Sequence, residues 1–242
     1  MDVLTFTLSG RNGFFKKPDV NAHVYFTYNN IHKVALLGIM GAILGYDGYN
    51  NQKESAYPEF YEKLSDLKIA IIPSKKNPNG LIPKKIQAFT NTTGYASYEA
   101  GGVLIVKEQW LEDPEWKICV ELDSEESKLL AEYLLSNKSV YTPYLGKNNF
   151  LADIKKVQIE KAWPVTEVPV IVDSLIDKKN IKKIVNPIEE NMFVSVETLP
   201  IGLEKITNLY LYQTFIYTNQ KLEVNDTSNL FLLESNDVAY FF

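Results

Sequence analysis

Three side chains that suit proton transfer lie within one short segment of this sequence: Tyr28, His32 and Lys33. His23 and His32 are the only two histidines of the chain. A tyrosine, a histidine and a lysine can together move protons at the 2′-hydroxyl of RNA without a metal ion. These three residues are therefore candidates for a metal-independent endoribonuclease. The alternative is structural, with His32 helping to begin the helix that follows it.

A second group of residues suits the binding of single-stranded nucleic acid. Arg11, Lys16 and Lys17 lie in one glycine-flanked loop with Phe14 and Phe15. Cations that hold phosphates and rings that stack on bases are the mixture that single-stranded RNA requires. The helix that begins after this region would add free backbone N–H groups at its start, where a phosphate can bind. The alternative for this loop is ordinary surface.

A second loop, residues 141–150, repeats the mixture of tyrosine, lysine and asparagine just before a long predicted strand. In the fold predicted below, the two loops lie within reach of each other. We therefore expect them to form one RNA-binding surface. Its candidate residues are Arg11, Phe14, Lys16, Lys17, Tyr28, Asn29, Lys33, Tyr144, Lys147 and Asn148.

Other chemistry finds little support in the residues. Two histidines and one cysteine make no ligand cluster with zinc spacing, and no acidic cluster resembles a calcium loop. The glycines at 38, 41 and 45 lie within a predicted helix rather than in a phosphate-binding turn between strand and helix. We therefore expect no metal and no cofactor. The net charge of −5 argues against a sequence-independent coat on nucleic acid.

The composition is that of an ordinary globular protein, with 45% hydrophobic and 23% charged residues. The single cysteine, Cys119, cannot form an internal disulfide and fits a reducing compartment. The chain begins directly with a predicted strand rather than a signal peptide. Its longest apolar stretch, residues 34–44, is too short to span a bilayer. We expect a cytoplasmic protein with no membrane partner.

Hydrophobic periodicity places the elements that must position these residues. Alternation predicts a strand over 2–8, and an apolar run predicts a helix over 34–45. Three glycines in that helix, Gly38, Gly41 and Gly45, each cost about 1 kcal/mol relative to alanine, which indicates close approach of another element. A short helix over 57–64 and a strand over 67–72 follow.

Residues 74–102 are polar and rich in turns with no strong period, and we expect a long insertion there. Strands resume at 103–106 and 116–122. Ser124 then caps a helix with acids in its first turn, and a long strand follows over 152–162. The order strand, helix, strand, strand, helix, strand is that of an α+β, ferredoxin-like (RRM-like) βαββαβ domain.

We therefore predict a ferredoxin-like RNA-binding domain over residues 1–163, with 74–102 as a long insertion. Residues 164–242 form a β-rich C-terminal appendage, with strand-like runs at 192–197, 209–217 and 230–233. The lysine-rich run 178–183 is interpreted as solvated surface.

The chain resembles the fifth-subunit family of CRISPR-associated Cascade complexes (Cas five, in the RAMP superfamily), most closely its type I-B branch. The motifs that carry the resemblance span residues 1–162. They are the loop from Ser9-Gly10 to Phe15-Lys16-Lys17, the stretch Thr27–Gly45 with Leu-Leu-Gly-Ile-Met-Gly-Ala-Ile-Leu-Gly, and Tyr141-Thr142-Pro143-Tyr144-Leu145-Gly146 with Phe150 and Ala152.

The resemblance implies a non-catalytic subunit of an antiviral surveillance complex that binds and caps the 5′ handle of CRISPR RNA. It implies contacts with a backbone subunit and a large subunit, and an indirect relation to target DNA. The insertion over 74–102 would be a protruding thumb against the backbone subunit. Its candidate residues are Lys75, Lys76, Lys84, Lys85, Tyr95 and Tyr98.

Two alternatives stay open. The type I-C branch of the same family is an endoribonuclease that matures the guide RNA, which would use Tyr28, His32 and Lys33 here. This chain lacks the Lys-His pair in its middle strands, and Asn29-Asn30-Ile31-His32 replaces the Pro-Pro stretch common before the first helix. The other alternative is a structural module that contacts only protein.

Overall fold

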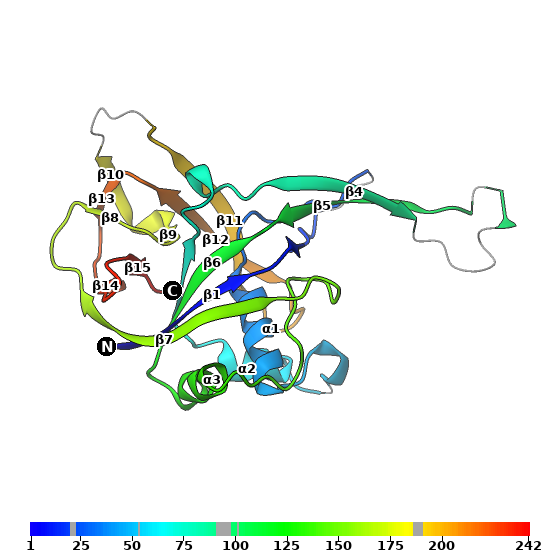
Figure 1. The fold of residues 1–242 in the computed structure, drawn as a ribbon, viewed down its shortest axis with the longest axis horizontal. Helices are drawn as coiled ribbons and strands as arrows, with labels where there is room; N and C mark the ends of the chain where they lie inside the picture. The colour runs from blue at the N-terminus through cyan, green and yellow to red at the C-terminus, as the bar shows by residue number, and fades with distance from the viewer. Residues whose placement is uncertain (20–22, 53, 91–97, 101, 186–190) are drawn as a thin grey trace.

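The computed structural model describes residues 1–19, 23–52, 54–90, 98–100, 102–185 and 191–242, and it is a mixed α/β structure built mostly of strands (Figure 1). Its largest sheet has six strands in the order β15-β14-β7-β1-β6-β3. Their bounds are β1 Asp2–Ser9, β3 Ile69–Pro73, β6 Glu115–Glu121, β7 Asp153–Pro164, β14 Leu230–Leu233 and β15 Val238–Tyr240. Neighbouring strands in this order pair antiparallel.

The alternation predicted for the first strand is present in β1, whose successive side chains lie on the two faces of this sheet. Leu4, Phe6 and Leu8 point into the main core, whereas Val3 packs on the other face with Cys119. A strand places successive side chains on opposite faces, so one strand can serve two cores. Burial raises the pKa of the Cys119 thiol, which fits the predicted role of a small buried hydrophobe.

Three helices pack below one face of the sheet in Figure 1: α1 Lys33–Leu44, α2 Glu59–Leu64 and α3 Glu125–Leu135. A Cβ built on Gly41 would lie 2.5 Å from Cβ of Phe60, so the predicted close approach is made by α2. Gly45 ends α1 with a φ of 83°, a conformation that glycine adopts without strain. The predicted Ser124 cap begins α3 and forms a capping box with Ser127.

A long β-hairpin extends away from the body (Figure 1). It consists of β4 Lys84–Thr90 and β5 Ile105–Glu112, and the short strand β2 Asn12–Gly13 pairs with the base of β5. The insertion over 74–102 shows no strong period in the sequence, and the structure places strand β4 within it, while the strand predicted at 103–106 overlaps the start of β5. No side chain of β4 is fully buried, so pairing with β5 rather than burial against a core stabilises it and hydrophobic alternation gave little signal.

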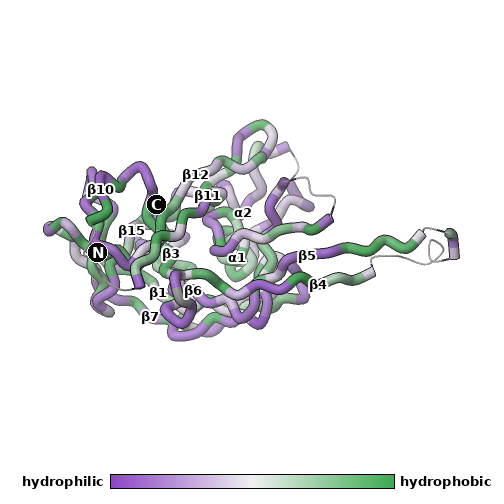
Figure 2. The backbone as a smooth tube through the Cα atoms, turned by 90° about the horizontal axis from the view of Figure 1, so that it is seen from above, coloured by the Kyte–Doolittle hydropathy of each residue, from purple (hydrophilic) through white to green (hydrophobic). Residues whose placement is uncertain are grey.

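The second arm of this hairpin begins with exposed apolar residues. Val103, Leu104 and Ile105 follow one another along its second arm, and each is more than half exposed. Figure 2 shows the same hydrophobic stretch beyond the label of β5. Contiguous exposed apolar residues are typical of surfaces that contact another molecule.

The C-terminal third is rich in strands, as predicted. One three-stranded sheet has the order β10-β13-β8, with β8 Val170–Ile171, β10 Ile181–Val185 and β13 Lys221–Val224. The other has the order β11-β12-β9, with β9 Ile176–Asp177, β11 Val194–Leu203 and β12 Tyr210–Thr218. Within the lysine run, Lys178 and Lys179 are exposed, while Lys182 lies on β10 and pairs with Glu223.

The C-terminal strands also complete the large sheet. Phe242 and Ile69 of β3 exchange two main-chain hydrogen bonds, of 3.0 and 3.2 Å. This contact joins the segment after β15 to the strand at the opposite end of the sheet order. Leu199, Leu203 and Phe215 of β11 and β12 pack into the main core. Among the described residues, no helix is long and apolar enough to cross a bilayer.

Candidate nucleic-acid interface

The Asn29-Asn30 turn, a centre of the sequence predictions, is directed inward. Glu197 of β11 accepts hydrogen bonds from the backbone N–H groups of Asn29 and Asn30, at 2.6 and 3.1 Å. The Asn29 amide donates to the Gly80 carbonyl at 2.9 Å and accepts from the Ile82 N–H and the Lys84 amine, at 3.1 and 2.7 Å. The turn therefore joins α1 to the base of the hairpin and to the C-terminal sheet.

His32 caps the start of α1. Its Nδ1 accepts the N–H of Ala35 at 3.2 Å, so the helix start expected to hold a phosphate is bonded by the chain itself. The ring is enclosed by Phe15, Tyr28 and Tyr210, with centroids 5.4 to 6.1 Å away. Burial lowers the pKa of His32 to about 3, so the imidazole is neutral at ordinary pH.

The structure brings Tyr28 and His32 together, but it engages Lys33 elsewhere. Tyr28 is buried, its hydroxyl donates to Tyr212 at 3.5 Å, and burial raises its pKa. The Lys33 amine donates to the main-chain oxygen of Phe242 at 3.1 Å, and burial lowers its pKa to about 8. Neither ring of the pair is open to solvent.

The loop after β1 presents its cations and buries its rings. Phe14 and Phe15 are 6% and 3% exposed, so both pack in the core. The Lys16 amine lies 3.8 Å from the centroid of the Tyr25 ring, and the Lys17 amine lies 5.3 Å from that of Tyr28. Among the described residues neither lysine has a carboxylate within salt-bridge distance, which leaves both charges available to a phosphate.

Arg11 lies apart from these lysines. It lines a separate hollow of about 640 Å³ together with Glu112, Asp113, Glu115 and Asp153. Lys76 also lines this hollow and pairs with Glu115, so four carboxylates face two cations there. This excess of negative charge disfavours a phosphate, because like charges repel. The sequence placed Arg11 with Lys16 and Lys17, but it could not show which side of the loop each cation faces.

The loop 141–150 divides its residues between support and exposure. The Lys147 amine forms a 2.7 Å ion pair with Glu108 of β5 and lies within 6.0 Å of the ring centroids of Phe14, Phe89, Trp110 and Phe150. Gly146 has a φ of 82°, and a Cβ there would lie 1.9 Å from the Phe14 carbonyl oxygen. Lys147 thus fixes the loop to the hairpin, while Tyr144 and Asn148 stay exposed.

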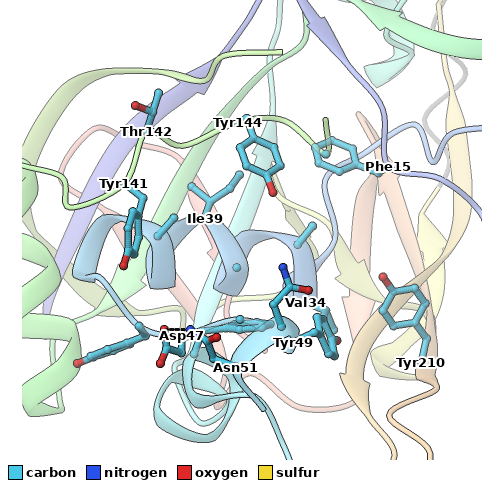
Figure 3. Close-up of a pocket in the computed structure, with 18 residues that line it drawn as sticks. Phe15, Val34, Ile39, Asp47, Tyr49, Asn51, Tyr141, Thr142, Tyr144 and Tyr210 are labelled. Atoms are coloured by element: carbon cyan, nitrogen blue, oxygen red, sulfur yellow. Dashed lines mark hydrogen bonds between the residues drawn. The ribbon is translucent and has the colours of Figure 1, made fainter. Parts of the chain in front are cut away.

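A groove of about 690 Å³ lies between this loop and α1 (Figure 3). Its floor is the half-buried stripe of Ala35, Gly38 and Ala42 on α1. Tyr141, Thr142 and Tyr144 line one side in Figure 3, and Asp47, Tyr49 and Asn51 line the other. Phe15 and Tyr210 lie at one end of the groove.

Sequence reasoning missed Tyr49 and Tyr210 in the groove and Tyr212 beside Tyr28, and it assigned Lys84 to the thumb rather than to the surroundings of Lys17. Partial burial lowers the pKa of Lys84; the Glu197 charge opposes this shift, and the Lys17 charge adds to it. These residues come from segments far from the two loops, so no local motif joins them. The one available signal was the small-residue stripe on α1, which left that face of the helix open.

The candidate thumb residues fall mainly at the base of the hairpin. Lys75 pairs with Asp173 and Asp237 at 3.0 and 3.2 Å, and Lys76 pairs with Glu115, so both lie against the body. Lys84 bonds Asn29, and Lys85 pairs with Glu112 at 3.3 Å. Tyr98 is highly exposed on the far part of the insertion, and Tyr95 lies outside the described residues.

Comparison with solved structures identifies the fold. A chain of a CRISPR RNA-guided surveillance complex has a TM-score of 0.52 and 13% identity, covering 93% of this chain and 92% of its own. A CRISPR protein from Archaeoglobus fulgidus has a TM-score of 0.49 and 10% identity, covering 99% and 98%. A chain of the type III-B Cmr-beta complex bound to cognate target RNA and AMPPnP has a TM-score of 0.44 and 11% identity, covering 92% and 86%.

Of these three similarities, the first is close enough to carry an argument. The chain shares its fold with a chain of a CRISPR RNA-guided surveillance complex. No protein-family model and no curated protein matches the sequence.

Proposed function

We propose that this protein is a non-catalytic, RNA-binding subunit of a type I Cascade surveillance complex, most like type I-B, acting in antiviral defence in the cytoplasm. It would bind and cap the 5′ handle of the CRISPR RNA. The observation that carries the proposal is the position of Lys16 and Lys17, which follow directly after Phe15 at one end of a tyrosine-lined groove. Cations next to accessible rings suit single-stranded RNA.

The fold supports this proposal at a finer level. The strands β7-β1-β6-β3 are adjacent in that order, α1 connects β1 to β3, and α3 connects β6 to β7. This connectivity is that expected of a ferredoxin-like βαββαβ core over residues 1–163. The β-rich region over 164–242 would then cover and brace this core, through Glu197 and the segment around Phe242.

The hairpin of β4 and β5 would be the thumb that contacts the neighbouring backbone subunit. It protrudes from the body, and Val103, Leu104 and Ile105 leave apolar surface exposed along it. Its position would hold the handle-binding loops next to that subunit. The large subunit and the target DNA would be met only within the assembled complex.

We propose binding without cleavage because the residues suited to proton transfer are enclosed. The capping role of His32 and its low pKa leave it a poor general base at neutral pH. Incubating the purified protein with precursor RNA in EDTA tests this part. Intact RNA that migrates as a complex is expected, whereas site-specific cleavage would establish the endoribonuclease instead.

The RNA-binding test replaces Lys16 and Lys17 by glutamate. A matched control makes the same charge change at the exposed Lys178 and Lys179. A second variant replaces Lys16 and Lys17 by glutamine, which removes both charges without reversing them. Each phosphate contact in a single strand contributes about 0.7 to the slope of log affinity against log salt concentration, so this variant should lower that slope by about 1.4. The glutamate variant should lose about tenfold or more in affinity for handle RNA, and the control should bind as the parent does.

If the Lys16 and Lys17 glutamate variant binds handle RNA as tightly as the parent at moderate salt, the proposal is contradicted. If the control at Lys178 and Lys179 loses as much affinity as this variant, the RNA is attracted by net charge alone, which also contradicts the proposal.

A further inference from the structure

We infer that the groove over α1 is a pocket for one or two unstacked nucleobases of the bound RNA. The inference rests on the proposed function and specifies it, because it separates where the bases bind from where the phosphates bind. The groove, bounded by α1 and the loop 141–150, is the larger of the two hollows described above. Four steps support the assignment.

The rims of the groove present rings that are accessible to a ligand. Tyr49, Tyr141 and Tyr144 are 50%, 55% and 44% exposed, although each is a large side chain beside a cavity. They come from two separated stretches of the chain, one around Tyr49 and the other the loop 141–150, and they converge on one space (Figure 3). Nucleobases stack on such rings, and the face of a tyrosine accepts any base.

The charge of the side chains that line the groove favours a neutral base over an anionic phosphate. None of the 18 described residues that line the groove is a lysine or an arginine, and Asp47 is its one charged residue. A phosphate would find no cation there and a nearby carboxylate. A neutral base would find polar partners for its edges in Asn50, Thr142 and the tyrosine hydroxyls.

The size of the groove agrees with this occupant. Pockets for small molecules span about 300 to 1,000 Å³, and this groove measures about 690 Å³. The floor is formed by Ala35, Gly38 and Ala42, whose small side chains leave room for a planar group above the helix. A Cβ built on Gly38 would meet only Phe60 Cε2, at 3.9 Å, so the floor is open at that point.

The neighbouring cations supply the backbone site that a bound strand needs. Phe15 lines the groove, and Lys16 and Lys17 are the next two residues. Consecutive Cα atoms lie 3.8 Å apart. Phosphates held by these lysines would therefore leave the attached bases within reach of the groove.

The test fills the groove from its floor. Gly38→Leu places a side chain in the space above α1, and leucine is a better helix former than glycine. The control, Ser136→Leu, adds the same side chain at an exposed position at the end of α3. The probe is a short single-stranded oligouridylate, whose uracils stack only weakly, carrying 2-aminopurine at one defined position; the fluorescence of 2-aminopurine falls when that base stacks on a ring.

With the parent protein, we expect quenching at one or two positions of the probe and not along its whole length. Gly38→Leu should abolish that quenching and lower affinity by about 5- to 150-fold, the range for losing one stacked base. Ser136→Leu should leave both unchanged. Tyr144→Ala, at an exposed rim, provides a second variant with the same expected result if Gly38→Leu does not fold.

The outcomes separate the two proposals. If the Lys16 and Lys17 variants lose RNA but both groove variants bind and quench as the parent does, the groove inference is wrong and the proposed function stands. If the parent binds no RNA, the proposed function is wrong. If the groove variants keep RNA and instead lose a partner subunit, the groove is a protein interface and the inference is overturned.

Discussion

Residues 27–33 and 141–150 have similar compositions, since each holds tyrosine, a pair of adjacent asparagines and a lysine. The first segment uses its polar groups within the chain: Asn29 and Asn30 bond Glu197 and the base of the hairpin, and His32 caps α1. The second uses Lys147 internally but leaves Tyr144 and Asn148 exposed. Residue type alone therefore does not separate a structural junction from a binding surface; accessibility does.

The comparison predicts that the first segment controls stability and that the exposed part of the second controls binding. One position in the second segment should break this rule. Gly146→Ala should destabilise the fold by about 3 kcal/mol or more, because it combines a left-handed φ of 82° with an overlap on the Phe14 carbonyl. Chemical denaturation measures the change.

Gly48→Ala is the matched control for this substitution, since a Cβ built there meets nothing within 4 Å. Its stability should change by no more than about 0.5 kcal/mol. Similar losses in the two variants would show that the overlap at Gly146 is relieved by a small loop movement.

The paired asparagines test the comparison directly. Asn29→Ala should destabilise the fold by about 2 to 3 kcal/mol, because it leaves the Gly80 carbonyl and the Ile82 N–H without this partner and leaves the Lys84 amine only its bond to the Ile82 carbonyl. Asn148→Ala, at an exposed position, should stay within about 0.5 kcal/mol of the parent. Denaturant midpoints at constant m-value would report both; equal effects would mean that the two segments are not distinct.

The pH dependence of stability sharpens the role of His32. Its pKa is about 3 in the folded state and 6.5 in a free histidine, so the unfolded chain binds more protons between these values. Stability should therefore fall as the pH is lowered from 6.5, by about 2 kcal/mol at about pH 5. Thermal unfolding across this range would reveal the slope.

His32→Asn keeps a side chain that can cap a helix but removes the titration. The variant should flatten this part of the stability profile whatever its absolute stability. An unchanged slope would assign the pH dependence to other groups.

The smallest expected effect concerns the internal part of the second segment. A double-mutant cycle with Lys147→Met and Glu108→Gln should give a coupling of about 1 kcal/mol, because the pair is partly enclosed by rings. The control is the exposed pair Lys155–Asp153, whose coupling should be close to zero. Equal coupling energies in the two cycles would mean that Lys147 and Glu108 interact as weakly as an exposed ion pair. Lys147 could then leave Glu108 to bind an RNA phosphate.

The sequence predicted the elements that a core defines. The strand at 2–8, the helices at 34–45, 57–64 and after Ser124, and the strands at 67–72, 116–122 and 152–162 all have counterparts in the structure. Each buries an apolar face or carries a cap, so its period or its cap residue is visible locally. The hairpin strand β4 was missed because mutual pairing, not a core, holds it in place.

The candidate site could be predicted only in part. Lys16, Lys17, Tyr144 and Asn148 are exposed enough to meet a ligand, whereas Phe14, Asn29 and Lys147 are engaged by the protein itself. Contacts between residues far apart in the sequence determine which of these side chains are exposed and which are engaged within the protein. Glu197 bonds residues 29 and 30, and Tyr210 completes the ring cluster around His32. A single sequence does not disclose such pairs.

The bonds between Phe242 and Ile69 have a consequence for biosynthesis. Strand β3 is made early, but the segment that pairs with its main chain at residue 69 lies more than a hundred residues further along the chain. During translation Ile69 must therefore remain without this pairing until Phe242 has emerged from the ribosome. Pairings of such long range form slowly, so we expect this side of the sheet to close late in folding.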